Sequence, residues 1–109
     1  MNPRLICVLG IDPGSSGAVA LLGVNGKPIT VFDVPTVLAY KSSKTRRMVD
    51  AGGLARNIKN MLIPYPATIA VVEDVRAMPG QGVSSMFSFG KSFGIALGVL
   101  AALEISTEL

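Results

Sequence analysis

The chain has 109 residues, of which 50% are hydrophobic and 16% charged, and its formal net charge is +3. This length and composition predict one folded domain and exclude global disorder. The absence of histidine and the single cysteine, Cys7, exclude Ser-His-Asp and Cys-His catalysis, histidine or thiolate metal cages and an internal disulfide. Hydrolytic chemistry would therefore depend on carboxylates, which select hard ions such as Mg²⁺ or Mn²⁺.

No segment predicts export or membrane insertion. The apolar stretch from Ser92 to Leu103 is interrupted by Gly94 and Gly98 and is shorter than the ~20 residues that span a bilayer, so we expect a buried helix. The apolar N-terminal run ends in Asp12-Pro13-Gly14 without a small-residue cleavage pattern. With one cysteine, these features favour a cytoplasmic protein.

The segment Gly10–Gly17, with the sequence GIDPGSSG, is the most informative part of the chain. It follows the apolar run Leu5–Leu9, which predicts a strand buried on both faces. Pro13 and Gly14 are expected to end this strand in a tight turn. Asp12 would then lie at the exposed tip of a central strand.

A three-strand meander is predicted for the first third of the chain. Residues 18–24 form the second strand, Asn25-Gly26 is a hairpin signal, and residues 27–34 form the third strand. Residues 35–49 have no clear periodicity. They contain four basic residues and no acidic one, namely Lys41, Lys44, Arg46 and Arg47.

A helix and a second apolar strand follow. Asp50 is expected to cap a helix that runs to about Leu62, before Pro64 and Pro66. Residues 67–72 form an apolar strand that also ends in an acidic residue, Glu73. We expect the neighbouring Asp74 to be a surface or capping carboxylate, because adjacent strand residues point to opposite faces.

A long helix, capped by Ser84 or Ser85, is predicted to run to about Glu104. Within it, small residues recur every four positions at Gly90, Gly94, Gly98 and Ala102. This row would allow another backbone to approach closely. We expect it to pack on the sheet or the first helix, with a dimer interface as the alternative.

The expected order is β-β-β-α-β-α, in which residues 105–109 only begin a returning strand. This order predicts an α/β domain with a mixed sheet, truncated before its last strand and helix.

Asp12 and Glu73 each follow a predicted strand, and functional sites in α/β sheets form at the carboxyl ends of strands. If the two strands are neighbours, both carboxylates lie within reach of one ion. Two ions about 4 Å apart can activate a water and stabilise the leaving oxygen of a phosphodiester. The residue types alone give equal weight to this metal site and to the alternative in which Asp12 is a turn residue and Glu73 a solvated strand end.

The order of these motifs resembles the RuvC family of Holliday junction resolvases, which have an RNase H-like fold, and most closely its phage-type nucleases. The resemblance is carried by Gly10–Gly14, the meander, Val71-Val72-Glu73 and the helix segment Lys91–Gly98. It implies a single RuvC-like nuclease domain over residues 1–109, C-terminally incomplete, that cleaves branched DNA in recombination and repair. It also implies that Asp12 and Glu73 are catalytic ligands of Mg²⁺ or Mn²⁺. The family completes its site with aspartates on a later helix, and this sequence ends before them.

Basic side chains supply the expected DNA contacts, which would be sequence-independent and salt-sensitive. Near Glu73, where the resolvases carry an aromatic residue that contacts the junction, this chain has Arg76 and Met78. Junction selectivity is therefore a weaker expectation than nuclease chemistry. A solvated loop is the alternative for the basic segment. The predicted contacts are Lys41, Lys44, Arg46, Arg47, Arg76 and Lys91.

Two other functions stay open. A non-catalytic DNA-binding or dimerisation module would have the same basic surface and helix. Actin-like and sugar-kinase ATPases also open with a strand, an aspartate and a Gly-Ser turn, which Gly10–Gly17 permits. Those proteins need a second phosphate loop in another half-domain, which this sequence does not contain.

Overall fold

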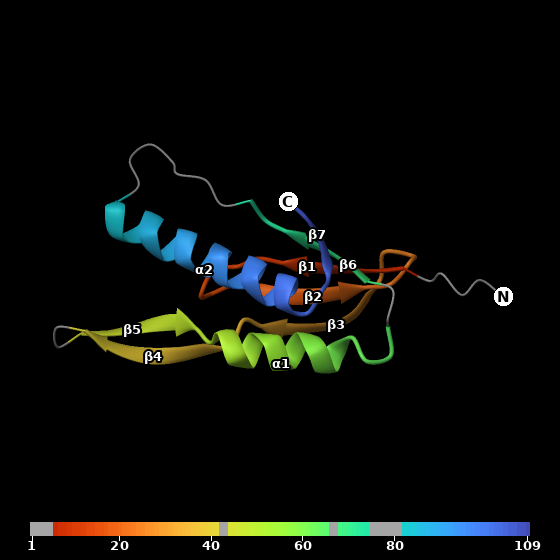
Figure 1. The fold of residues 1–109 in the computed structure, drawn as a ribbon, viewed down its shortest axis with the longest axis horizontal. Helices are drawn as coiled ribbons and strands as arrows, with labels where there is room; N and C mark the ends of the chain where they lie inside the picture. Colours follow the sequence, from red (N-terminus) through yellow and green to blue (C-terminus); the bar gives the residue numbers. More distant parts are fainter. Residues whose placement is uncertain (1–5, 42–43, 66–67, 75–81) are drawn as a thin grey trace.

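The computed structural model describes residues 6–41, 44–65, 68–74 and 82–109. It is a mixed α/β structure with an elongated outline (Figure 1). Its elements are β1 (Cys7–Ile11), β2 (Ala18–Leu22), β3 (Pro28–Asp33), β4 (Thr36–Lys41), β5 (Lys44–Val49), α1 (Ala51–Met61), β6 (Thr68–Val72), α2 (Val83–Ala102) and β7 (Ser106–Glu108).

A five-stranded sheet in the order β3-β2-β1-β6-β7 forms the centre of the molecule. Strands β1, β2 and β3 form the predicted antiparallel meander. Its turn contains Gly26 with φ of 78° and an Asn25 side chain that accepts a hydrogen bond from the Lys27 amide. Strand β6 runs parallel to β1, and β7 runs parallel to β6. The crossover through α2 therefore does return to the sheet, as a short strand within residues 105–109, where the sequence predicted only the beginning of a strand.

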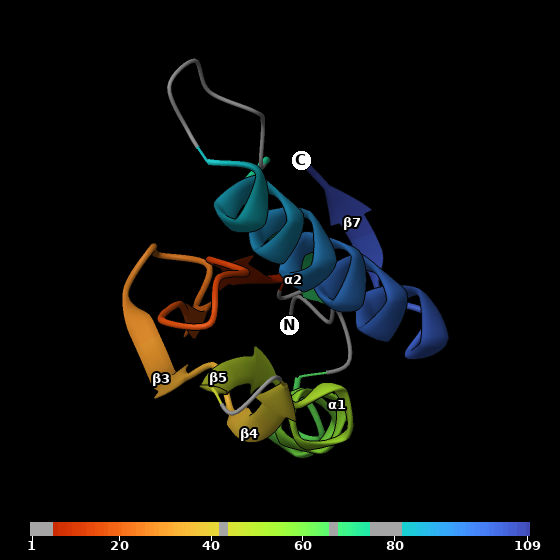
Figure 2. The ribbon, with the colours of Figure 1, turned by 90° about the vertical axis from the view of Figure 1, so that its left-hand side faces the viewer.

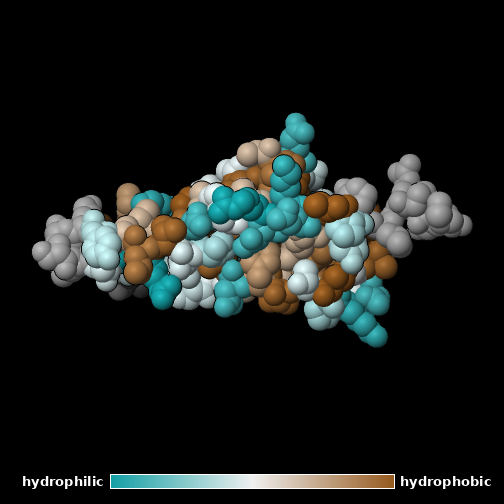
Figure 3. Space-filling model, turned by 90° about the horizontal axis from the view of Figure 1, so that it is seen from below, coloured by the Kyte–Doolittle hydropathy of each residue, from teal (hydrophilic) through white to brown (hydrophobic). Residues whose placement is uncertain are grey.

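Residues 36–49 form a second, separate two-stranded sheet, the β4–β5 hairpin. The sequence showed no clear periodicity here, and this hairpin was not predicted. The hairpin projects from the body of the molecule beside the N-terminal half of α2 (Figures 1 and 2). Hydrophobic and hydrophilic surfaces alternate at this end in the view from below (Figure 3), and Val37, Leu38 and Tyr40 are exposed.

Helix α1 begins as predicted at Asp50, whose carboxylate accepts a hydrogen bond of 3.0 Å from the Gly53 amide. Gly53 is buried, and a Cβ atom there would contact the Asp50 carboxylate and the Pro35 ring. The glycine therefore makes room for the capping carboxylate that starts the helix. Leu54 and Ile58 lie on the buried face of α1.

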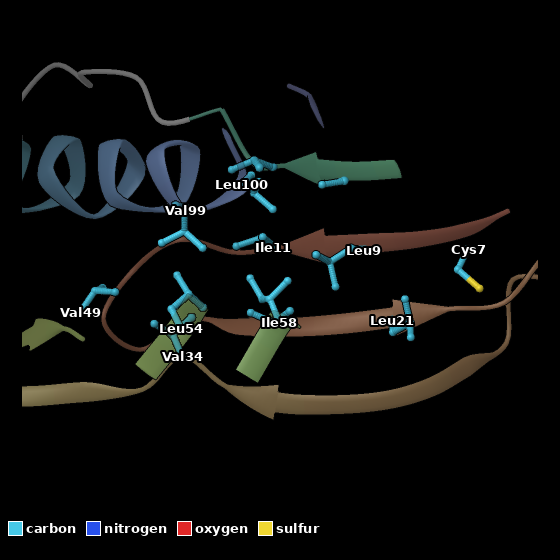
Figure 4. Packing of buried hydrophobic residues seen from close by; sticks show 14 residues of the cluster. Cys7, Leu9, Ile11, Leu21, Val34, Val49, Leu54, Ile58, Val99 and Leu100 are labelled. Atoms are coloured by element: carbon cyan, nitrogen blue, oxygen red, sulfur yellow. The ribbon is translucent and has the colours of Figure 1, made fainter. Parts of the chain in front are cut away.

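Both helices cover the same face of the sheet. Alternate residues of the central strands, such as Leu9, Ile11 and Leu21, are fully or almost fully buried and form one cluster with both helices (Figure 4). Helix α2 contributes Val99 and Leu100 to this cluster. The remaining buried members are Cys7, Val19, Val34, Val49, Leu54, Ile58, Ala70, Val72 and Ala96.

The opposite face of the sheet is apolar but not covered by either helix. One row across this face consists of Val31, Ala20, Gly10 and Val71, which are in register on four strands. Val31 is 59% exposed and Val71 42% exposed. The expectation that the first strand is buried on both faces was therefore wrong: along β1, buried and half-buried residues alternate.

The N-cap of helix α2 is Gly82, so the helix begins earlier than expected from a cap at Ser84 or Ser85. A Cβ atom built on Gly90, Gly94 or Gly98 meets no atom within 4 Å, and all three residues are exposed. The expected packing of this glycine row within the chain is wrong. The helix is also long and apolar enough to cross a membrane, with 17% of its most apolar window buried. The expectation of a buried helix was therefore wrong for most of this window, and length and composition alone are weak evidence for a membrane span.

Candidate active site

Asp12 and Glu73 directly follow neighbouring parallel strands. The last residues of β1 and β6, Ile11 and Val72, are in register and both buried. One residue further on, the Glu73 amide donates a hydrogen bond of 3.0 Å to the Ile11 carbonyl oxygen. Parallel strands lie about 4.8 Å apart, so the two acidic residues are side by side at the same sheet edge. Both are exposed.

The turn after Asp12 is compact and allows little variation. The Asp12 amide donates to the Ala18 carbonyl at 3.0 Å, and the Gly17 amide donates to the Gly14 carbonyl at 2.9 Å. A Cβ atom at Gly17 would collide with the Asp12 carbonyl group. The Asp12 carboxylate accepts a long hydrogen bond of 3.4 Å from the Gly14 amide. The backbone of this turn thus fixes where the carboxylate leaves the sheet.

The pair of carboxylates fits a hard divalent cation, because both side chains are exposed and offer oxygen ligands only. Asp74, the next residue after Glu73, is also exposed. Within the described ranges, no group of three or more histidine, cysteine, aspartate or glutamate residues gathers closely enough to hold a metal ion. The described part of the chain therefore supplies two carboxylates, with water left to fill most of an ion's coordination shell.

A cavity of about 730 Å³ lies between the β4–β5 hairpin and the N-terminal half of α2. Two hydrogen bonds join its walls: Arg46 Nη2 donates to Ser84 Oγ at 3.0 Å, and Lys91 Nζ donates to Met48 Sδ at 3.9 Å. Ser15, from the turn after Asp12, also lines the cavity. The basic cavity and the carboxylate pair are therefore neighbouring features of one end of the molecule. The other lining residues are Ala39, Arg47, Val49, Val83, Phe87, Ser88, Ser92 and Ile95.

The structure brings together three of the six predicted DNA contacts. Arg46, Arg47 and Lys91 line the cavity, although Lys91 is more than forty positions after the two arginines in the sequence. Lys41 and Lys44 are paired residues at the end of the hairpin, where only their backbone is described. Arg76 lies outside the described residues. The basic segment is thus a hairpin wall and not a loop.

Sequence reasoning identified Lys91 but missed the other cavity residues that α2 contributes. Ser84, Ser88 and Ser92 recur every four positions, as do Phe87, Lys91 and Ile95, and all six line the cavity. Four-residue spacing places side chains on one helix face. That spacing was the available signal, but the sequence interpretation singled out the neighbouring row of glycines, each three positions after Phe87, Lys91 or Ile95.

Comparison of the chain with protein-family models and with curated proteins gave no match.

Proposed function

We propose that this protein is a metal-dependent endonuclease of the RuvC-like type, which hydrolyses phosphodiester bonds of branched DNA. The observation that carries the proposal is the placement of Asp12 and Glu73 side by side, at the carboxyl ends of parallel strands β1 and β6. A carboxylate pair at this edge is where an α/β sheet builds a functional site, and the absence of histidine excludes histidine-dependent hydrolysis.

The sheet supports the finer assignment to an RNase H-like fold. When the β4–β5 hairpin is treated as an insertion, the remaining order is β-β-β-α-β-α-β. The meander leads into two further strands that run parallel to its first strand. This is the order expected from the resemblance, extended by the short strand β7.

In this proposal the two carboxylates hold Mg²⁺ or Mn²⁺, which supplies an activated water and charge stabilisation at the phosphate. Asp12 is fixed by the compact turn that Gly17 permits, and Glu73 by its backbone hydrogen bond to Ile11. Arg46, Arg47 and Lys91 hold DNA phosphates near this edge by charge. The proposed location is the cytoplasm.

Metal binding by the purified chain tests the proposal directly. The EPR signal of free Mn²⁺ should fall on titration with the wild type, and Asp12→Asn or Glu73→Gln should each weaken the binding at least tenfold. Glu104→Gln, at an exposed carboxylate just beyond α2, is the matched control. Equal Mn²⁺ affinity in all four proteins would refute the carboxylate site.

Catalysis is tested on a labelled four-way junction with Mg²⁺ or Mn²⁺. Because the described residues offer only two carboxylates to the ions, we expect this 109-residue chain to cleave slowly and to lose that activity in Asp12→Asn. A chain extended beyond β7 by a helix bearing further aspartates should cleave faster. Fast Mg²⁺-dependent cleavage that survives Asp12→Asn would show that the catalytic residues lie elsewhere.

A non-catalytic DNA-binding module is the second candidate, because the basic cavity does not depend on the carboxylate pair. It predicts unchanged DNA affinity and no cleavage in every variant of Asp12 and Glu73. The ATP-binding alternative predicts saturable nucleotide binding at Gly10–Gly17, which titration with ATP would detect.

A further inference from the structure

The cavity beside α2 combines a cationic rim with an apolar wall. The cations are Arg46, Arg47 and Lys91, and none of the described residues that line the cavity is acidic. The apolar wall includes Met48, Phe87 and Ile95. A volume of about 730 Å³ is in the range of pockets that enclose small organic ligands, whereas contact with a duplex backbone needs only a charged surface.

Phe87 is the unusual member of this wall. Its side chain is 72% exposed, although a phenylalanine in a helix normally packs into a core. The ring is therefore available for contact with a flat partner. Aromatic rings beside cations are the usual platform for unpaired nucleotides, because every base offers a π-face and every nucleotide a phosphate.

The cavity is also close to the proposed chemistry. Ser15, which lines it, is three residues from Asp12 in the same turn. Phe89, two residues after Phe87 in α2, lies against the same segment, since a Cβ atom at Gly14 would be 4.0 Å from its ring and 3.8 Å from the Asp12 carboxylate. A nucleotide held in the cavity would therefore belong to a DNA strand that runs past Asp12 and Glu73.

We propose that this cavity takes one unstacked nucleotide of the DNA substrate. Its base lies against Phe87 and Met48, and its phosphates contact Arg46, Arg47 and Lys91. A paired base keeps its faces covered within the stack, so only an unpaired or extruded base fits. At a branch point the stacking between neighbouring base pairs is interrupted, which lowers the cost of extruding a base. The identity of the ligand as DNA rests on the proposed function, whereas the base-binding role rests on the cavity itself.

The test compares three fluorescent duplexes by anisotropy: one fully paired, one with a single bulged nucleotide, and one in which that bulged nucleotide is abasic. The wild type should bind the bulged duplex about tenfold more tightly than either of the others, which is a low value for stacking of one base. Phe87→Ala should reduce binding of the bulged duplex to the level of the paired one. It should leave paired-duplex binding unchanged.

Tyr40→Ala is the matched control, because Tyr40 is an aromatic residue of the hairpin that is 80% exposed and does not line the cavity. This variant should keep the full preference for the bulge. Thermal unfolding of each variant shows whether it is folded, and the exposure of both side chains predicts small changes.

The outcomes separate the two proposals. Equal affinity of the wild type for the bulged and abasic duplexes would overturn the base-binding cavity while leaving the nuclease proposal intact, provided that Mn²⁺ binding still depends on Asp12. No binding of any DNA would overturn both. A polyglutamate peptide that binds in a Phe87-dependent manner, with no bulge preference, would assign the cavity to acidic peptides instead.

Discussion

The amide of Glu73 donates a 3.0 Å hydrogen bond to the carbonyl oxygen of Ile11. This bond continues the parallel pairing of β1 and β6 one residue beyond their last registered pair. Because the backbone holds the two strand ends together, the separation of the Asp12 and Glu73 side chains depends on strand register and only weakly on side-chain packing.

The turn at Gly17 should tolerate no side chain. A Cβ atom there would overlap the Asp12 carbonyl group and approach the Gly14 carbonyl oxygen, and neither backbone group can move without breaking the turn. Gly17→Ala should lower the free energy of unfolding by about 3 kcal/mol, measured by urea denaturation. Gly90→Ala, in open space within α2, should instead raise it by about 1 kcal/mol. Equal effects would contradict this account of the turn.

DNA affinity should fall as salt rises, because Arg46 and Arg47 replace counterions on phosphates. The double variant Arg46→Ala, Arg47→Ala should shallow the slope of log affinity against log salt by about two units at most. The control is Arg56→Ala, Lys59→Ala, which removes the same charge from the exposed surface of α1. If the two double variants have the same slope, the cavity contributes no phosphate contacts.

The exposed glycine row of α2 should support a homodimer. Since Gly90, Gly94 and Gly98 leave open space around their Cα atoms, a second helix can approach closely there. Gly94→Leu should therefore weaken self-association at least tenfold in sedimentation equilibrium, with the fold preserved. Asn57→Leu places the same side chain on the exposed surface of α1 and should leave association unchanged. A monomeric wild type would contradict this role of the glycine row.

The uncovered face of the sheet should bind a hydrophobic dye. Val31 and Val71 lie in one row on this face and are largely or partly exposed. Val31→Thr with Val71→Thr should reduce ANS fluorescence and aggregation, and should change the free energy of unfolding by less than about 0.5 kcal/mol per site. A large loss of stability would mean that these valines are packed in solution.

Local sequence signals predicted much of the five-stranded sheet and helix α1. The Asn25-Gly26 turn, the proline stop after α1 and the Asp50 cap each depend on residues close together in sequence. These signals predicted the meander, α1 and the two acidic strand ends. The burial of β1 was misjudged because an apolar run on an uncovered face has the same composition as one buried on both sides.

The hairpin and the cavity could not be predicted in the same way. In residues 36–41 the exposed Val37 and Leu38 are adjacent, so the period-two alternation typical of a strand is missing. The cavity joins Arg46 to Ser84 across 38 positions, and such a contact depends on the path of the chain through α1 and β6. Local sequence patterns do not predict a contact between residues so far apart in the sequence.

Because the two sheets are separate, the sequence of the hairpin can vary independently of the five-stranded sheet. The β4–β5 hairpin is closed at its base by the hydrogen bond from the Asp50 amide to the Pro35 carbonyl, and it shares no ladder with the five-stranded sheet. Its strands can be lengthened, shortened or recharged without breaking any pairing that positions Asp12 and Glu73. Ligand preference can therefore diverge among descendants of this chain while the acidic edge is inherited intact.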